Sequence, residues 1–288
     1  MDVALIGYGE VGRILGEDLR AAGQTVTAFD LKLDSDEGER LRAHARAHAV
    51  TLAGSHAEAV RSAELVISAV TASQTIAAAE ACAPALPAGS FFLDLNSASP
   101  GAKMAAAGMV AGGAGRYVDG AVMTAVPPYR LKVPLLLGGP DAAALVPQLL
   151  DLGFSAKLAS GRLGVASATK MCRSVIIKGM ETLFTESLLT ARRLGVERDV
   201  LDSLQDTIAT DWDKLAGYMV MRTLKHGKRR AEELREVART VAEAHIPPVM
   251  ASAIAERQDM AWKLGEGVNL DAGLMALLDA VLEKLPEE

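Results

Sequence analysis

A short apolar run near the start of the chain leads directly into a glycine-rich segment. Val3-Ala4-Leu5-Ile6 is followed by a Gly-x-Gly-x-x-Gly pattern, and such an apolar run is typical of a strand buried on both faces. In this pattern the first glycine permits a tight turn, the second lets a pyrophosphate approach the backbone, and the third lets the next helix pack closely. The segment therefore predicts a dinucleotide site. Its expected binding residues are Gly7, Tyr8, Gly9, Glu10, Val11 and Gly12.

The following residues complete the expected strand-helix-strand unit. A helix is expected from about Val11 to Ala22, Gly23 should end it, and Thr25–Phe29 should form the second strand. The N-terminus of such a helix offers free N–H groups and a positive dipole end to phosphates. Asp30 follows the second strand, where a carboxylate accepts hydrogen bonds from the ribose of NAD and repels the 2′-phosphate of NADP. NAD is therefore the expected cofactor, with NADP less favoured; Lys32, two residues on, could soften that repulsion.

Length and composition fit a protein of two domains. The chain has 288 residues, half of them hydrophobic, whereas one domain usually takes roughly 100–200 residues. The formal net charge of −6 gives no general attraction to nucleic acid or to an anionic membrane. No apolar stretch reaches the ~18–20 residues of a membrane-spanning helix. The chain starts directly with a strand, so we expect no signal peptide and a cytoplasmic protein. Cys82 and Cys172 are expected to be small buried side chains.

Strands and helices alternate up to about residue 160. Further strands are expected at 65–70, 91–95, 117–121, 134–138 and 155–158, and helices at 35–48, 141–152 and in the alanine-rich stretch between the strands at 65–70 and 91–95. This alternation predicts an α/β fold in which residues 1–160 form a doubly wound Rossmann sheet.

Strand signals vanish after Gly161, and residues 161–288 are predicted to form an all-α C-terminal domain. Helices are expected at 166–194, 199–215, 217–224, 228–244 and from 248 onward, with a break at 265–269. The first of these is apolar on most faces, which is typical of a helix buried in a larger assembly. A helical domain of this size cannot cover it alone, so a homodimer packed through the helical domains is expected.

Ligands of an open α/β sheet bind beyond the carboxyl ends of its strands. Three segments stand there: 70–73, 96–100 and 123–126. Serine and asparagine also cap helices, and this is the expected role of Ser99 before Pro100. Asn96 and Ser97 directly follow the strand at 91–95. For these two residues we favour a role at the nicotinamide and the substrate over a capping role. The expected cofactor contacts here are Val70, Thr71 and Asn96, and the expected substrate contacts are Ser97, Met123, Thr124 and Ala125.

Lys170 stands near the start of the long apolar helix. A buried lysine must be paired, must titrate at a lowered pKa, or must face a ligand. Ser174 and Glu181 return to the same helix face. A structural and a catalytic role fit these residues about equally well. Lys178 and Arg173, on neighbouring faces, could hold either an anionic substrate or partner carboxylates.

The order of these segments resembles that of the β-hydroxyacid dehydrogenases. It combines the glycine pattern, Asp-x-Asn-Ser-x-Ser-Pro at 94–100, a loop after the strand at 117–121, and a lysine early in a long helix. The family includes 3-hydroxyisobutyrate, tartronate semialdehyde and 6-phosphogluconate dehydrogenases, with imine reductases as relatives. The resemblance implies that Lys170 is the general acid/base, with Thr124 and Ser174 orienting a small-molecule substrate.

The chain departs from the family pattern at two places. Residues 119–125 keep the start of the family's substrate loop but lack its Ser-Gly-Gly, and Ser174 replaces an asparagine four residues after the lysine. Residues 226–234 resemble a less-characterised, phosphogluconate dehydrogenase-like branch. The expected function is therefore NAD-dependent hydride transfer to or from a β-hydroxy acid or related alcohol, with the substrate open. The alternatives are an imine reductase, against which the retained Lys170 argues, and a non-catalytic NAD-binding protein.

Three histidines complete the candidates. His226 precedes Gly227, and we expect a loop that brings it to the substrate, with a solvated helix N-terminus as the alternative. His44 and His48 have the i, i+4 spacing of metal ligands, but the sequence offers no clear third ligand, so no metal site is expected. The basic run at 228–230 is expected to lie on a solvated helix with i, i+4 pairs; a phosphate site is the alternative.

Overall fold

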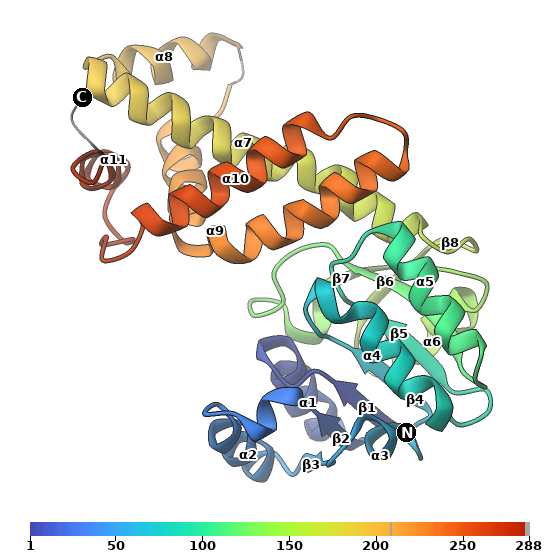
Figure 1. Ribbon diagram of the computed structural model, residues 1–288. Helices are drawn as coiled ribbons and strands as arrows, with labels where there is room; N and C mark the ends of the chain where they lie inside the picture. Colours follow the sequence, from blue (N-terminus) through green and yellow to red (C-terminus); the bar gives the residue numbers. More distant parts are fainter. Residues whose placement is uncertain (208, 286–288) are drawn as a thin grey trace. The chain divides into compact units, whose positions relative to one another are not determined.

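The computed structural model describes residues 1–207 and 209–285. The chain divides into two compact units, Met1–Met171 and Cys172–Glu288. The first holds the α/β part of the chain and the second is helical (Figure 1). The predicted fold class, a Rossmann sheet followed by an all-α region, is confirmed. Within the described residues, no helix combines the length and the apolar character needed to cross a membrane.

The first unit is built on one eight-stranded sheet. Its strand order is β3-β2-β1-β4-β5-β6-β7-β8, and every neighbouring pair is parallel except β6 and β7. The strands are β1 Asp2–Ile6, β2 Thr25–Phe29, β3 Thr51–Leu52, β4 Leu65–Ser68, β5 Phe91–Asp94, β6 Arg116–Val122, β7 Pro134–Gly138 and β8 Ser155–Ser160. The chain runs outward from β1 in both directions, which places the ligand crevice of such a sheet at the carboxyl ends of β1 and β4.

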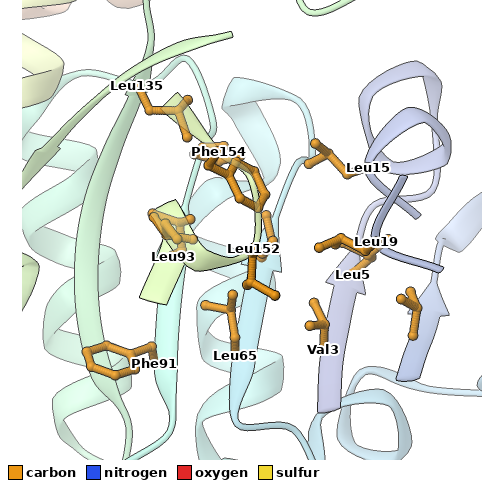
Figure 2. Packing of buried hydrophobic residues seen from close by; sticks show 14 of the residues in the cluster. Val3, Leu5, Leu15, Leu19, Leu65, Phe91, Leu93, Leu135, Leu152 and Phe154 are labelled. Atoms are coloured by element: carbon orange, nitrogen blue, oxygen red, sulfur yellow. The ribbon is translucent and has the colours of Figure 1, made fainter. Parts of the chain in front are cut away.

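Helices cover both faces of this sheet. They are α1 Glu10–Ala21, α2 Gly38–Ala47, α3 His56–Val60, α4 Thr75–Cys82, α5 Pro100–Ala111 and α6 Ala142–Asp151. Side chains of β1 alternate between two cores: Val3 and Leu5 pack with α1, α2 and α6, whereas Ala4 and Ile6 pack with α3, α4 and α5. Figure 2 shows the first of these cores, in which Leu15 and Leu19 of α1 lie over Val3 and Leu5.

The second unit consists of long helices. These are α7 Val165–Leu194, whose first turns belong to the first unit, α8 Glu197–Thr207, α9 Trp212–Glu243, α10 Val249–Leu264 and α11 Leu274–Leu282. Their core contains Leu188, Val220, Leu224, Ala261 and Leu278. Helices α9 and α10 approach closely at Gly227, where a Cβ atom would lie 2.3 Å from the backbone oxygen of Gln258.

Several sequence predictions for the helices were wrong. The separate helices expected at 217–224 and 228–244 form one continuous helix, α9, because Gly227 serves the close contact with α10 and does not end the helix. The helix expected at 199–215 ends at Thr207, and α9 starts after Asp211, which caps it by accepting a hydrogen bond from the Lys214 amide at 3.0 Å. Residue 208, inside that predicted helix, lies outside the described residues.

Smaller differences concern short elements and one cysteine. The sequence did not predict β3 and α3, which are too short to show a periodicity. The helix expected at 35–48 begins only at Gly38, after a 3₁₀ turn at Leu31–Asp34. Cys82 is buried as predicted, but Cys172, on α7, is exposed.

Candidate functional site

The glycine-rich loop has the geometry that a dinucleotide site requires. Gly7 has a φ of 95°, and a Cβ there would lie 2.6 Å from the Ala69 oxygen; at Gly12 it would lie 2.0 Å from the Gly7 oxygen. Both positions therefore demand glycine for the turn and for the helix contact. At Gly9 a Cβ would meet nothing within 4 Å. The protein itself does not require a glycine there, whereas a closely approaching pyrophosphate would.

Asp30 is fixed at the carboxyl end of β2. One carboxylate oxygen accepts a hydrogen bond from the Tyr8 amide at 2.6 Å, and the other accepts one from the Lys32 amide at 2.8 Å. The first bond ties the acid to the glycine-rich loop. Carboxylate oxygens have more than one acceptor site each, so Asp30 can still receive ribose hydroxyl groups. The residues present thus fit an adenine dinucleotide.

The ammonium group of Lys32 is engaged by an acidic neighbour. Its Nζ atom lies 2.6 Å from Oε1 of Glu37, on the exposed surface beside α2. A lysine held by a carboxylate offers less neutralisation to a 2′-phosphate than a free one. The pairing with Glu37 therefore weakens the ability of Lys32 to offset the repulsion between Asp30 and the 2′-phosphate of NADP.

Two of the predicted site residues meet at the carboxyl edge of the sheet. Nζ of Lys170, in the second turn of α7, donates a hydrogen bond to Oγ of Ser97 at 2.5 Å. Ser97 follows β5, and both residues belong to the first unit. Both side chains are partly buried. A lysine amine held by a serine hydroxyl beside the crevice of the sheet can exchange a proton with a bound hydroxyl group.

Asp119 anchors the start of α7 and so determines where Lys170 lies. One carboxylate oxygen of Asp119 accepts hydrogen bonds from both the amide and the hydroxyl group of Ser167, each at 3.0 Å. The amide of Ser167 belongs to the first turn of the helix, where backbone donors lack helical partners. A side chain of β6 thus caps the helix, and Lys170 follows three residues later.

A buried group of charges lies beneath this edge. Parallel pairing places Asp94 of β5 beside Asp119 of β6, and Nζ of Lys103 lies 2.8 Å from Asp94 and 3.7 Å from Asp119. All three side chains are fully buried. Tyr117 donates to the second oxygen of Asp94 at 2.6 Å, and burial together with the two carboxylates raises the pKa of Tyr117. Lys103 is thus the cation that offsets the buried carboxylates of Asp94 and Asp119.

Asn96 joins the ends of two strands. Its amide oxygen accepts a hydrogen bond from the Val70 amide at 2.7 Å, and its amide nitrogen donates to the Ser68 hydroxyl at 3.0 Å. The side chain is buried, so it shapes the loop after β4. Two residues of that loop are expected at the cofactor: Val70, which is half-buried, and Thr71, which is exposed.

The predicted substrate loop extends from the end of β6. Thr124 and Ala125 are exposed and Met123 is half-buried, and the Met123 amide is held by the Pro134 oxygen at 3.0 Å. Because β6 is parallel to β5, this loop leaves the sheet at the same edge as Ser97.

The remaining predicted substrate residues lie in the second unit. Ser174 is buried, one turn beyond Lys170 on α7. Lys178 is also buried, and its Nζ atom lies 2.6 Å from Oε2 of Glu233 on α9. Burial lowers the pKa of Lys178, and the adjacent Glu233 carboxylate opposes that shift. Lys178 could hold either an anionic substrate or a partner carboxylate; in the structure it is paired with the carboxylate of Glu233.

Glu181, on the same face of α7, is neutralised by arginines of α9. It contacts Arg230, and its Oε1 atom lies 3.3 Å from Nε of Arg222. Glu181 and Arg230 are both buried. Part of the basic run at 228–230 is therefore turned inward: the prediction of a solvated helix holds for Lys228 and Arg229, which are exposed, but is wrong for Arg230.

His226 does not lie in a loop. It occupies the middle of α9, so both expected settings, a loop and a helix N-terminus, were wrong. Its half-buried side chain borders a shallow surface hollow together with Lys225, Arg229 and Glu232. The physical origin is the same as for the misplaced helix break: Gly227 lies inside α9 against Gln258 of α10 and does not end the helix.

The sequence reasoning missed the charges that support the site. Lys103 reads as an ordinary surface lysine in an alanine-rich helix, and its burial follows only from the positions of Asp94 and Asp119. The one usable signal was a pair of aspartates inside two strands that are otherwise largely apolar. Two buried carboxylates at one sheet edge call for a cation.

Comparison with known sequences matches two families over parts of the chain. Residues 2–97 match a family described as NADP oxidoreductase, coenzyme F420-dependent. Residues 191–260 match a domain of unknown function, DUF1932.

Solved structures resemble the chain over nearly its whole length. A conserved hypothetical protein from Sinorhizobium meliloti 1021 is 35% identical, with a TM-score of 0.82, and covers 99% of this chain and 97% of its own. A conserved protein of unknown function, described as structurally similar to 3-hydroxyacid dehydrogenases, is 31% identical, with a TM-score of 0.75, and covers 91% of this chain and 97% of its own.

A characterised enzyme shares the fold at lower identity. The 3-hydroxyisobutyrate dehydrogenase of Mycobacterium tuberculosis, described with L-serine, is 18% identical, with a TM-score of 0.75, and covers 97% of this chain and 98% of its own. The resemblance predicted from the sequence is thus confirmed, and the chain belongs to the β-hydroxyacid dehydrogenase family.

Proposed function

We propose that this protein is an NAD-dependent oxidoreductase that transfers a hydride between the cofactor and a β-hydroxy acid or related alcohol. The observation that carries the proposal is the hydrogen bond from Lys170 to Ser97 at 2.5 Å, at the sheet edge where dinucleotide sites of this fold lie. Bound NAD would supply the nicotinamide ring that accepts the hydride. In this direction Lys170 accepts the proton of the substrate hydroxyl group, and in the reverse direction it returns that proton to the developing alkoxide.

Three polar residues are assigned to the substrate. Ser97 receives a hydrogen bond from Lys170, which orients the amine and leaves the serine hydroxyl proton for a substrate oxygen. Thr124, exposed at the end of β6, and Ser174, one turn beyond Lys170, would orient the substrate. Lys178 is already balanced by Glu233, so we assign it to the support of α7.

NAD is the proposed cofactor because of Asp30 and Lys32. A carboxylate at the end of the second strand would repel a 2′-phosphate, and the lysine that could offset its charge is paired with Glu37. The similarity of residues 226–234 to a phosphogluconate dehydrogenase-like branch stays a prediction, as does the substrate within the class of β-hydroxy acids.

We also propose a homodimer formed through α7. Its exposed side chains include Cys172, Ile176, Leu183 and Leu194. At 100° per residue these four positions fall within about 40° of one another, so they form one stripe along the helix. Exposed apolar stripes of this kind mark interfaces, and a second copy of α7 would cover them.

Turnover assays with the purified protein test the proposed function. Reduction of NAD is measured across a panel of β-hydroxy acids, and oxidation of NADH across the matching keto acids and cyclic imines. We expect turnover with at least one hydroxy acid. Turnover with imines alone would favour an imine reductase. Tight binding of NAD without any turnover would identify a non-catalytic binding protein.

A further inference from the structure

Three potential metal ligands converge on the face of the first unit formed by α1 and α2. One ligand atom from each of Glu17, His44 and His48 lies within 4.8 Å of the other two. Glu17 belongs to α1, whereas His44 is in α2 and His48 directly follows that helix. The two imidazole rings lie 4.4 Å apart between centroids. The sequence showed only the two histidines, and the fold supplies the third ligand from a different helix.

We propose that Glu17, His44 and His48 bind a divalent transition-metal ion. Two imidazoles and one carboxylate are a donor set that Zn²⁺ accepts, with water completing the tetrahedron. Among the described residues no other group of histidine, cysteine and carboxylate side chains has this spacing. Nitrogen ligands favour Zn²⁺, Ni²⁺ and Cu²⁺ over Mg²⁺ and Ca²⁺, which prefer oxygen.

Tyr8 provides the supporting contact that such sites use. Its hydroxyl oxygen lies 3.0 Å from Nδ1 of His44, and the two rings meet edge to face at 72°. Tyr8 itself is fully buried. Metal-bound histidines normally use their second ring nitrogen for a hydrogen bond that fixes the ring and its tautomer. In the tautomer in which Nδ1–H donates to Tyr8, Nε2 of His44 carries the lone pair that would bind the ion.

The ionic neighbours of Glu17 limit how strongly the site binds. Nη2 of Arg130 lies 2.9 Å from Oε2 of Glu17, so an ion competes with this arginine for the carboxylate. Arg130 also donates to Asp18 through Nε at 2.8 Å, so it keeps an ionic partner when Glu17 turns to the metal. The ion would therefore replace one ion pair without leaving a guanidinium unpaired.

A bound ion would link α1 to α2 and reach the glycine-rich loop. Tyr8 belongs to that loop, and its amide donates to Asp30 at 2.6 Å. Because the folded unit holds all three ligands together, binding should stabilise it against unfolding by mass action. This inference does not depend on the proposed reaction.

Calorimetric titration of Zn²⁺ into the full-length protein, treated with chelator and then dialysed, tests the site. We expect one ion per chain and a rise in the melting temperature that EDTA reverses. Glu17→Gln, His44→Ala and His48→Ala should each weaken binding by at least ~10-fold. Unfolding without metal shows whether each variant is folded.

Two control variants separate this site from other surface ligands. His245→Asn removes an exposed histidine of the second unit, and asparagine tolerates the positive φ of 60° at this position. Cys172→Ser removes the exposed thiol. Both variants should bind Zn²⁺ like the unmodified protein. Unchanged affinity in His48→Ala, loss of binding in Cys172→Ser, or no binding of Zn²⁺ by the unmodified protein would overturn the proposal.

Discussion

At the residue scale, the candidate site depends on contacts between positions far apart in the chain. Lys170 and Ser97 are 73 residues apart, and each could be singled out from the sequence by its setting. Their meeting follows from topology, since β5, β6 and the start of α7 reach the same sheet edge. Lys103 could not be found in this way, because a charged residue in a helix gives no sign of its burial until the carboxylates around it are located.

The proposed preference for NAD rests on Asp30. The unmodified protein should prefer NAD over NADP by at least ~10-fold in kcat/KM, because the like charges of Asp30 and a 2′-phosphate repel each other. Asp30→Ala should narrow or invert this ratio, whereas Asp34→Ala, in the adjacent 3₁₀ turn, should leave it unchanged. Steady-state kinetics with both cofactors give the ratio. Equal or better use of NADP by the unmodified protein would contradict the assignment.

The buried carboxylates of Asp94 and Asp119 should destabilise the protein when Lys103 is removed. Lys103→Met leaves Asp94 and Asp119 buried without their cation, a change that typically costs about 3–5 kcal/mol of unfolding free energy. Urea unfolding of the first unit measures this loss. Lys157→Met, on an exposed position of β8, is the matched control and should change stability by less than ~0.5 kcal/mol. A small effect of Lys103→Met would show that the cluster does not depend on the lysine.

At the level of helices and strands, strong local patterns predicted the element boundaries well, whereas a glycine inside a helix led to a false helix end. β2 and β7 lie at the predicted residues, and α7 begins one residue before its prediction, because long apolar runs and clear turns define such elements. Gly227 gives the same local signal as a helix end, yet it sits inside α9 where α10 approaches. Only the packing between α9 and α10 distinguishes a glycine inside a helix from one that ends it. The prediction of separate helices at 217–224 and 228–244 was wrong for this reason.

Two glycines of the same loop should respond differently to alanine. Gly12→Ala places a Cβ 2.0 Å from the Gly7 oxygen, so it should lower the melting temperature and abolish NAD binding together. Gly9→Ala meets no protein atom within 4 Å, so folding should persist while NAD affinity falls by ~10-fold or more as the methyl group obstructs the pyrophosphate. Thermal unfolding and fluorescence titration with NADH separate the two effects. Undiminished affinity in Gly9→Ala would argue against a dinucleotide at this loop.

At the scale of the whole molecule, composition and element order could predict a Rossmann unit followed by a helical unit. They could not predict which polar residues of the helical unit would neutralise one another. Glu181 with Arg230, and Lys178 with Glu233, are pairs between α7 and α9 whose register depends on the packing of two long helices. From the sequence of α7 alone, Lys178 could therefore be assigned to a substrate, although Glu233 of α9 already pairs with it.

Assembly should depend on the apolar stripe of α7. Light scattering at micromolar concentration should give the mass of a dimer for the unmodified protein. Ile176→Glu and Leu183→Glu place charges in the stripe, where both side chains are more than 60% exposed, and should shift the protein toward a monomer. Leu31→Glu, equally exposed in the first unit, should not. A monomer mass for the unmodified protein would contradict the proposed dimer.

The proposed function depends above all on Lys170 as the group that transfers the proton in hydride exchange. Its test is the kcat of Lys170→Ala, measured beside the melting temperature and the NAD affinity of this variant. We expect a ~10²–10⁴-fold loss of kcat with little change in NAD affinity. Lys170→Arg should not restore activity, because a guanidinium group cannot act as a base. In alcohol oxidation, kcat/KM of the unmodified protein should rise with pH as the lysine is deprotonated, and this rise should be absent in Lys170→Ala. Near-normal turnover by a folded Lys170→Ala protein would show that Lys170 is not the proton-transfer group.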